Sequence, residues 1–175
     1  MSLAGFTLIE LLMVMAIIAV LAFVAAAMMV DMPTMRLDMA TRKIQSDIRY
    51  AQSLAISTQG WTGILFSAAN DNYIVYTDGT GATPAGWAVA TDPRTRGNYT
   101  VQLNANEFED VDITIVSFNT INFGLIFDKW GNPYGYNIGA GTYSALANPA
   151  GVRLSDGTDT TDVRVERGTG RAYIL

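Results

Sequence analysis

The first thirty residues hold the longest apolar run of the chain. Residues 11–30 follow one another without a polar side chain. At about 1.5 Å of rise per residue, a helix of this length spans roughly 30 Å, enough to cross the hydrocarbon of a bilayer. Leu, Met and Ala favour helix, and neither Gly nor Pro interrupts the run. The pattern predicts a transmembrane helix.

Two other interpretations of this segment fit its pattern less well. A cleavable secretory signal peptide needs a basic start and an apolar core of about 7–15 residues, followed by a cleavage site flanked by small residues. Residues 25–27, all alanine, offer such a site, but no Lys or Arg precedes the run and the run is too long. A buried helix of a soluble protein would be unusually long. A membrane-spanning helix therefore fits the pattern best.

A second helical pattern follows, with apolar residues in steps of three and four at Leu37, Ala40, Ile44, Ile48, Ala51 and Ala55. The charged residues of this segment fall largely off that stripe: Arg36, Asp38, Arg42, Lys43, Asp47 and Arg49. We predict an amphipathic helix over residues 34–58 that stops near Gly60, with Pro33 breaking or kinking the chain before it. We expect a sheet to cover its apolar face; a helix lying on lipid is the alternative.

From Trp61 onward, short apolar runs alternate with turn signals, which predicts strands. The expected strands are residues 61–67, 72–77, 99–103, 111–116, 121–127, 151–154, 161–167 and 171–175. Turns are expected at residues 78–81, 82–86, 131–133 and 168–170. Strands that follow one another without intervening helices favour antiparallel pairing. The predicted fold class is α+β, with a long N-terminal helix packed on an antiparallel sheet.

The composition excludes several kinds of catalytic site and metal site. The 175 residues include no His and no Cys, which excludes a Cys nucleophile, a His base, disulfides and thiolate or imidazole zinc sites. We find no Ser or Asp constellation with another base, so we expect no enzyme and no cofactor. The net charge of −5 argues against a partner held mainly through its phosphates.

Three further groups of residues are candidate sites. The acidic stretches 107–112 and 156–162 do not match a calcium-binding loop, and we interpret them as solvated loops with no metal. We interpret residues 128–134 as a turn flanked by aromatic residues and expect no calcium ligand there. Trp61, Trp87 and Trp130 are expected to be core and rim aromatics.

Glu10 stands at the head of the apolar run, where an unpaired carboxylate in hydrocarbon costs on the order of 2–3 kcal/mol. It lies either at headgroup level or beside a cation inside a protein assembly. The string Gly5-Phe6-Thr7-Leu8-Ile9-Glu10 resembles the processing site of type IV prepilins and type II secretion pseudopilins. The resemblance implies that a prepilin peptidase cuts between Gly5 and Phe6 and methylates Phe6. It also implies that Glu10 pairs with the free amine of Phe6 in a neighbouring subunit, so that neither charge is left unpaired in the apolar filament core.

The order of the helical and strand segments along the chain is similar to that of the minor pseudopilins and minor pilins of the GspH/FimT branch. The segments that carry this likeness are residues 51–57, the strand after Gly60 and the closing hairpin over residues 163–171. The resemblance implies a leader over residues 1–5, a filament-core helix over 6–30, an amphipathic half over 31–60 and a β-rich head over 61–175. It implies other pilin subunits, an inner-membrane assembly platform and membrane lipid as partners.

The predicted orientation of the chain in the membrane depends on the family resemblance rather than on the distribution of charge. Family leaders usually carry Lys or Arg, whereas residues 1–4 have none, so we expect a start upstream of Met1 or a trimmed leader. Because all 11 basic residues lie at or beyond Arg36, the positive-inside rule alone would leave the head in the cytoplasm. The processing motif instead implies a single-pass inner-membrane protein with a periplasmic head, which then enters a pilus or pseudopilus.

The sequence is compatible with three functions. The first is a non-catalytic filament subunit of a secretion or pilus machine. The second is a DNA-binding subunit for uptake, whose candidate contacts are Arg164, Arg167 and Arg171 beside Arg153; so few cations on an acidic head favour weak binding at most. The third is a membrane-anchored binding domain that does not polymerise.

Overall fold

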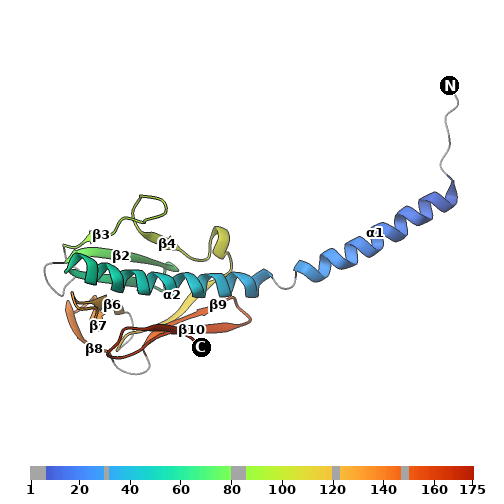
Figure 1. Cartoon of the computed structure of the whole chain (residues 1–175). Helices are drawn as coiled ribbons and strands as arrows, with labels where there is room; N and C mark the ends of the chain where they lie inside the picture. Colours follow the sequence, from blue (N-terminus) through green and yellow to red (C-terminus); the bar gives the residue numbers. More distant parts are fainter. Residues whose placement is uncertain (1–6, 30–31, 80–85, 120–122, 147–149) are drawn as a thin grey trace.

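The computed structural model describes residues 7–29, 32–79, 86–119, 123–146 and 150–175. Two helices open the chain, α1 (Leu8–Met29) and α2 (Met32–Thr58). Pro33 lies in the first turn of α2, where its missing N–H costs no helical hydrogen bond. Whether the chain breaks or kinks before Pro33 concerns residues 30–31, which lie outside the described residues. Figure 1 shows α1 extending away from a β-rich head, whereas α2 runs along it.

The head contains two antiparallel sheets. The larger has the strand order β3-β2-β1-β6-β7-β8, with β4 also paired to β2. Its strands are β1 (Trp61–Ser67), β2 (Asn72–Gly79), β3 (Ala88–Val89), β4 (Thr100–Gln102), β6 (Phe123–Phe127), β7 (Pro133–Asn137) and β8 (Thr142–Ala145). The smaller sheet has the order β11-β10-β9-β5, from β5 (Asp112–Ser117), β9 (Gly151–Ser155), β10 (Thr160–Val165) and β11 (Ala172–Ile174). The short 3₁₀ helix η1 (Asn106–Phe108) precedes β5.

The apolar stripe of α2 forms the centre of the head. All six predicted stripe residues are at most 2% exposed, and they pack with inward-facing residues of both sheets. The helix contacts β1, β2 and β6 on one side and β9, β10 and β11 on the other. The prediction of an amphipathic helix covered by a sheet is therefore confirmed, as is the α+β class. A helix lying on lipid would leave this stripe outside the protein core.

Several strands differ from the sequence prediction. The chain forms two sheets rather than one, because β1 pairs with β6 while β5 pairs with β9, far along the sequence. The strands β3, β7 and β8 were missed. Strand β7 begins at Pro133, the last residue of the predicted turn, and its sequence PYGYN has turn residues at alternate positions. Strand β2 continues through Gly79, where a turn was expected. Most of the expected turn at 82–86 lies outside the described residues.

Candidate functional site

The N-terminal helix α1 begins at Leu8, directly after Thr7. The backbone N–H of Glu10 donates to the carbonyl oxygen of Thr7 at 3.1 Å and to its hydroxyl at 3.3 Å, so Thr7 caps the helix. Glu10 then lies in the first turn, where a carboxylate interacts favourably with the helix dipole. Gly5 and Phe6, the predicted processing residues, lie outside the described residues.

The surface of α1 has no covering layer within the head. The window Leu8–Ala25 is long and apolar enough to cross a membrane, and none of its residues is buried. Phe23, for example, is 79% exposed. A continuous apolar helix surface of this kind must be covered by lipid or by other helices. Among the described residues, no cation forms an ion pair with Glu10.

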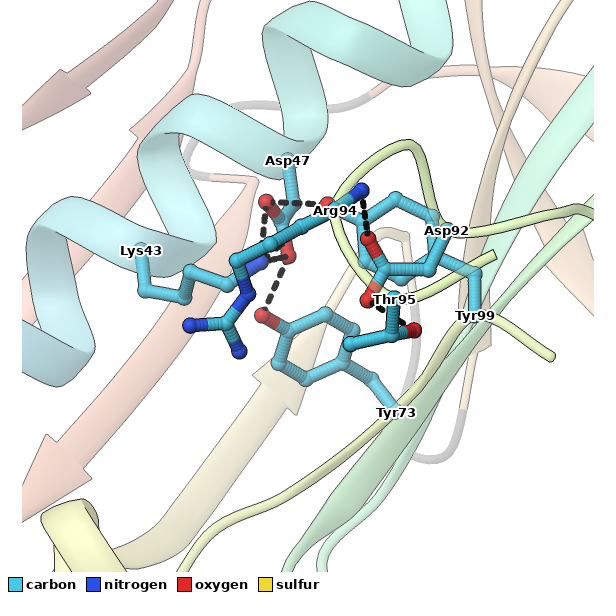
Figure 2. Close-up of polar contacts among 7 residues, drawn as sticks. All are labelled: Lys43, Asp47, Tyr73, Asp92, Arg94, Thr95 and Tyr99. Carbon is cyan, nitrogen blue, oxygen red and sulfur yellow. Dashed lines mark hydrogen bonds and ion pairs between the residues drawn. The ribbon is translucent and has the colours of Figure 1, made fainter. Parts of the chain in front are cut away.

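The head contains a buried carboxylate that joins α2 to the larger sheet (Figure 2). Asp47 is 2% exposed. Its two oxygens accept hydrogen bonds from the Tyr73 hydroxyl at 2.6 Å and the Tyr99 hydroxyl at 2.8 Å. Lys43, one turn earlier on α2, donates to both oxygens at 2.6 and 2.7 Å. Each oxygen thus accepts two hydrogen bonds, as a buried charge requires.

The two tyrosines remain protonated donors. Burial, together with the negative charge of Asp47, raises the pKa of Tyr73 well above its ordinary value. The same two causes raise the pKa of Tyr99. The ammonium of Lys43 also lies 4.9 Å from the centre of the Tyr99 ring and 3.1 Å from its hydroxyl oxygen. We name these four residues, Lys43, Asp47, Tyr73 and Tyr99, the Asp47 cluster.

A short loop closes the side of the Asp47 cluster. Asp92 accepts hydrogen bonds from the backbone N–H of Arg94 at 2.8 Å and the hydroxyl of Thr95 at 3.0 Å (Figure 2). Burial acts to raise the pKa of Asp92, but these hydrogen bonds and the charge of Lys43 outweigh it, so the pKa is lowered. The arrangement holds a helix against a sheet; the phenols and carboxylate are fully engaged with one another, which indicates a structural role.

The sequence pattern placed Asp47 among charges that fall largely off the apolar stripe, and it did not reveal that Asp47 is buried. Asp47 lies three residues after Ile44 and four before Ala51, which puts it at the edge of the stripe. The two tyrosines that meet it come from β2 and the segment before β4. Only Lys43, four residues earlier, signals the pairing in sequence. The tyrosines are 26 and 52 residues away from Asp47, so no local pattern could identify them.

The arginines proposed as DNA contacts are not gathered into one unpaired group. Arg164 donates to Asp162 through Nε at 3.2 Å and also through Nη2, and Arg153 holds the same carboxylate at 2.7 and 3.0 Å. Arg167 and Arg171 are exposed, near the turn that joins β10 to β11. Two of the four arginines, Arg153 and Arg164, are therefore paired with Asp162.

This arginine pair predicts a pH dependence of stability. Hydrogen bonds from Arg153 and then from Arg164 lower the pKa of Asp162 to about 2, against the opposing effect of its burial. A carboxyl whose pKa is depressed on folding contributes stability above its unfolded pKa, about 3.9, and loses it as the pH falls through about 2. We expect Asp162→Asn to lower the free energy of unfolding by about 1–2 kcal/mol at pH 7, allowing for the exposure of Arg153. Denaturant unfolding from pH 7 to pH 2 should show the two proteins converging; a constant difference would contradict this origin.

The acidic stretches contain local contacts rather than a cation site. Glu109 and Asp110 both pair with Arg36, at 3.3 and 3.1 Å, and so attach the η1 region to the start of α2. Asp156 accepts hydrogen bonds from the backbone N–H groups of Thr158 and Asp159 within its own turn. Over the part of the chain that the structure describes, no group of three or more acidic residues is placed to hold a metal ion.

Comparison with known proteins adds evidence at the N-terminus. Residues 2–26 match the family described as the prokaryotic N-terminal methylation motif. No curated protein and no solved structure matches the chain. The matched segment contains the capped start of α1 and Glu10, and most of the apolar helix. It indicates a type IV pilin-like prepilin that is processed by prepilin peptidase.

Proposed function

We propose that the protein is a non-catalytic minor pilin or pseudopilin of the GspH/FimT type, in the filament of a type II secretion or type IV pilus machine. The observation that carries this proposal is the coincidence of the methylation motif over residues 2–26 with an apolar helix whose side chains through Ala25 are all exposed. A motif for N-terminal processing and a helix that needs a nonpolar environment are the two requirements for assembly through α1.

The mature N-terminus would be Phe6, created by cleavage after Gly5. Before assembly the helix would cross the inner membrane once, with the head in the periplasm. In the filament, α1 would pack against the same helix of neighbouring subunits, and Glu10 would meet the Phe6 amine of one of them. An acid in an apolar bundle stabilises only the register in which a cation reaches it, because an unpaired charge there is costly.

The DNA-uptake alternative has less support. Arg164 is committed to Asp162, which leaves Arg167 and Arg171 on a head of acidic overall charge. Binding through so few phosphate contacts would be weak and would fall steeply with salt.

The first test is the mass and N-terminal sequence of the protein from membranes with and without the prepilin peptidase. We expect a chain that begins at methylated Phe6 only when the peptidase is present. A chain that keeps Met1 in both samples, or one that begins near Ala27, would contradict the proposed function and favour an anchored or secreted domain.

A further inference from the structure

The face of the smaller sheet that points away from α2 holds two arginines that share one carboxylate. Arg153 on β9 and Arg164 on β10 each donate to Asp162 through Nε and Nη2. These hydrogen bonds hold the pKa of Asp162 at about 2, so the carboxylate is ionised at neutral pH. Over the described part of the chain, the Nη1 groups of both arginines donate to no acceptor. One net positive charge and unused guanidinium donors therefore remain on this face.

A hollow of about 190 Å³ lies beside these charged residues and is lined also by Ile115, Ser117 and Gly151. We name it the arginine groove. Gly151 on β9 pairs with Ser117 of β5 and with Arg164 of β10. A side chain at Gly151 would lie 3.0 Å from Cδ of Arg164 and would overlap the carbonyl oxygen of Val163, so glycine lets Arg164 lie close over β9. Because pockets for drug-sized ligands begin at about 300 Å³, the arginine groove admits a single side chain.

Exposed apolar residues flank the arginine groove on both sides. In the register of the sheet, Ile115 lies opposite Arg153, and Tyr173 lies opposite Arg164. Ile115 is 45% exposed and Tyr173 is 38% exposed. The alternate residues of β9 and β10 belong instead to the core beneath α2: Val152, Leu154, Val163 and Val165. The face therefore presents charged donors between apolar edges, and Arg and Tyr are residues enriched at the centres of protein interfaces.

We propose that the arginine groove binds a carboxylate side chain, Asp or Glu, that lies between apolar residues on a different subunit of the filament. Charge complementarity supports this occupant, because the groove has one net positive charge on a chain of net charge −5. The inference rests on the proposed function, in which the neighbours of a minor subunit are other pilins. It names the chemistry by which this subunit recognises such a neighbour, and it requires no second copy of the chain.

The geometry favours a carboxylate over the phosphates of a nucleic acid. A partner carboxylate can accept charge-assisted hydrogen bonds from the free Nη1 groups. Asp162 already fixes both guanidiniums, so little side-chain entropy is lost on binding. A nucleic acid instead requires a row of cations that neutralise successive phosphates. Here Asp162 offsets one of the two arginine charges, and the groove has room for one side chain rather than an extended backbone.

The direct test measures the binding of two short blocked peptides, Ala-Leu-Glu-Leu-Ala and Ala-Leu-Gln-Leu-Ala, to the purified full chain in detergent. We expect the Glu peptide to bind about tenfold more tightly, because charge-assisted hydrogen bonds are stronger than neutral ones. Ile115→Glu should abolish this preference, since it places a competing carboxylate opposite Arg153. Ile115→Lys loses the same apolar side chain but should keep the preference, so the two variants differ only in charge. Thr142→Glu adds an exposed acid on β8 of the larger sheet and serves as the second control.

The same variants in cells with the peptidase test whether the occupant belongs to the filament. We expect Ile115→Glu to lower the fraction of processed subunit recovered in sheared filaments by about fivefold, because it repels the partner's acid. Ile115→Lys and Thr142→Glu should be recovered like wild type. Thermal unfolding of each purified variant should be unchanged, since both positions are exposed.

The outcomes separate this inference from the proposed function. Equal binding of the two peptides, or binding of neither, would overturn the carboxylate site. Tighter binding of a short single-stranded oligonucleotide than of the Glu peptide would also overturn it in favour of a nucleic acid. Normal filament recovery of Ile115→Glu, or an equal loss for Ile115→Lys, would overturn a filament subunit as the occupant. Wild type that is neither processed nor assembled would overturn the proposed function, whereas the peptide titration on purified protein tests the arginine groove separately.

Discussion

Asp47→Ala is expected to lower the free energy of unfolding of the full chain in detergent by about 3–5 kcal/mol. The substitution removes the acceptor for the Tyr73 and Tyr99 hydroxyls and the carboxylate that is directly paired with the partly buried Lys43 ammonium. Buried polar groups without partners keep their full desolvation cost, which is why the effect exceeds that of one lost hydrogen bond. Denaturant unfolding followed by tryptophan fluorescence measures it.

The same helix supplies a matched control. Asp38 and Arg42 form an i,i+4 ion pair like that of Lys43 and Asp47, but with side chains 56% and 70% exposed. Asp38→Ala should change the free energy of unfolding by about 0.5 kcal/mol or less. Similar losses for Asp47→Ala and Asp38→Ala would show that burial does not determine the strength of the Asp47 cluster. We also expect Lys43→Met to be milder than Asp47→Ala, because it leaves the two tyrosine hydrogen bonds in place.

Glu10→Gln is expected to reduce the incorporation of the processed subunit into filaments by on the order of a hundredfold. Membrane insertion should be unaffected, because removing a charge from the head of an apolar helix eases insertion. The amide keeps the size of the side chain and its hydrogen-bonding groups but cannot neutralise a neighbouring amine. Sheared-filament fractions and membrane fractions, compared by immunoblot against wild type, give both quantities.

Glu10→Asp is the informative comparison for Glu10→Gln. It keeps the charge and shortens the side chain, so we expect partial incorporation. If Glu10→Gln assembles as well as wild type, the acid is not needed for assembly, and a headgroup-level position becomes the better account of Glu10. If Glu10→Gln fails to insert, the loss of filaments would have a different cause from the missing ion pair.

The predictions that succeeded depended on periodicity within one segment. The apolar run predicted α1, and the six-residue stripe of α2 is buried in full, since a helix repeats its faces every 3.6 residues regardless of what covers them. Strands with alternating or continuous apolar residues, such as β1, were located to the residue. Strands with alternating turn residues, such as β7, were missed, because their conformation comes from pairing with β6 rather than from local preference.

The candidate functional residues likewise fall into those that the sequence identifies and those that only the structure identifies. The processing motif and Glu10 are readable from six adjacent residues, since a peptidase recognises a local string. The Asp47 cluster joins residues that are distant in sequence. Buried or exposed placement of a charged residue depends on which strand passes over it, and loop closure over 26 or 52 residues leaves no local trace. Local order therefore specified the apolar helix α1, the amphipathic helix α2 and the methylation motif, whereas long-range strand pairing decided that Asp47 is buried and that Trp130 is exposed.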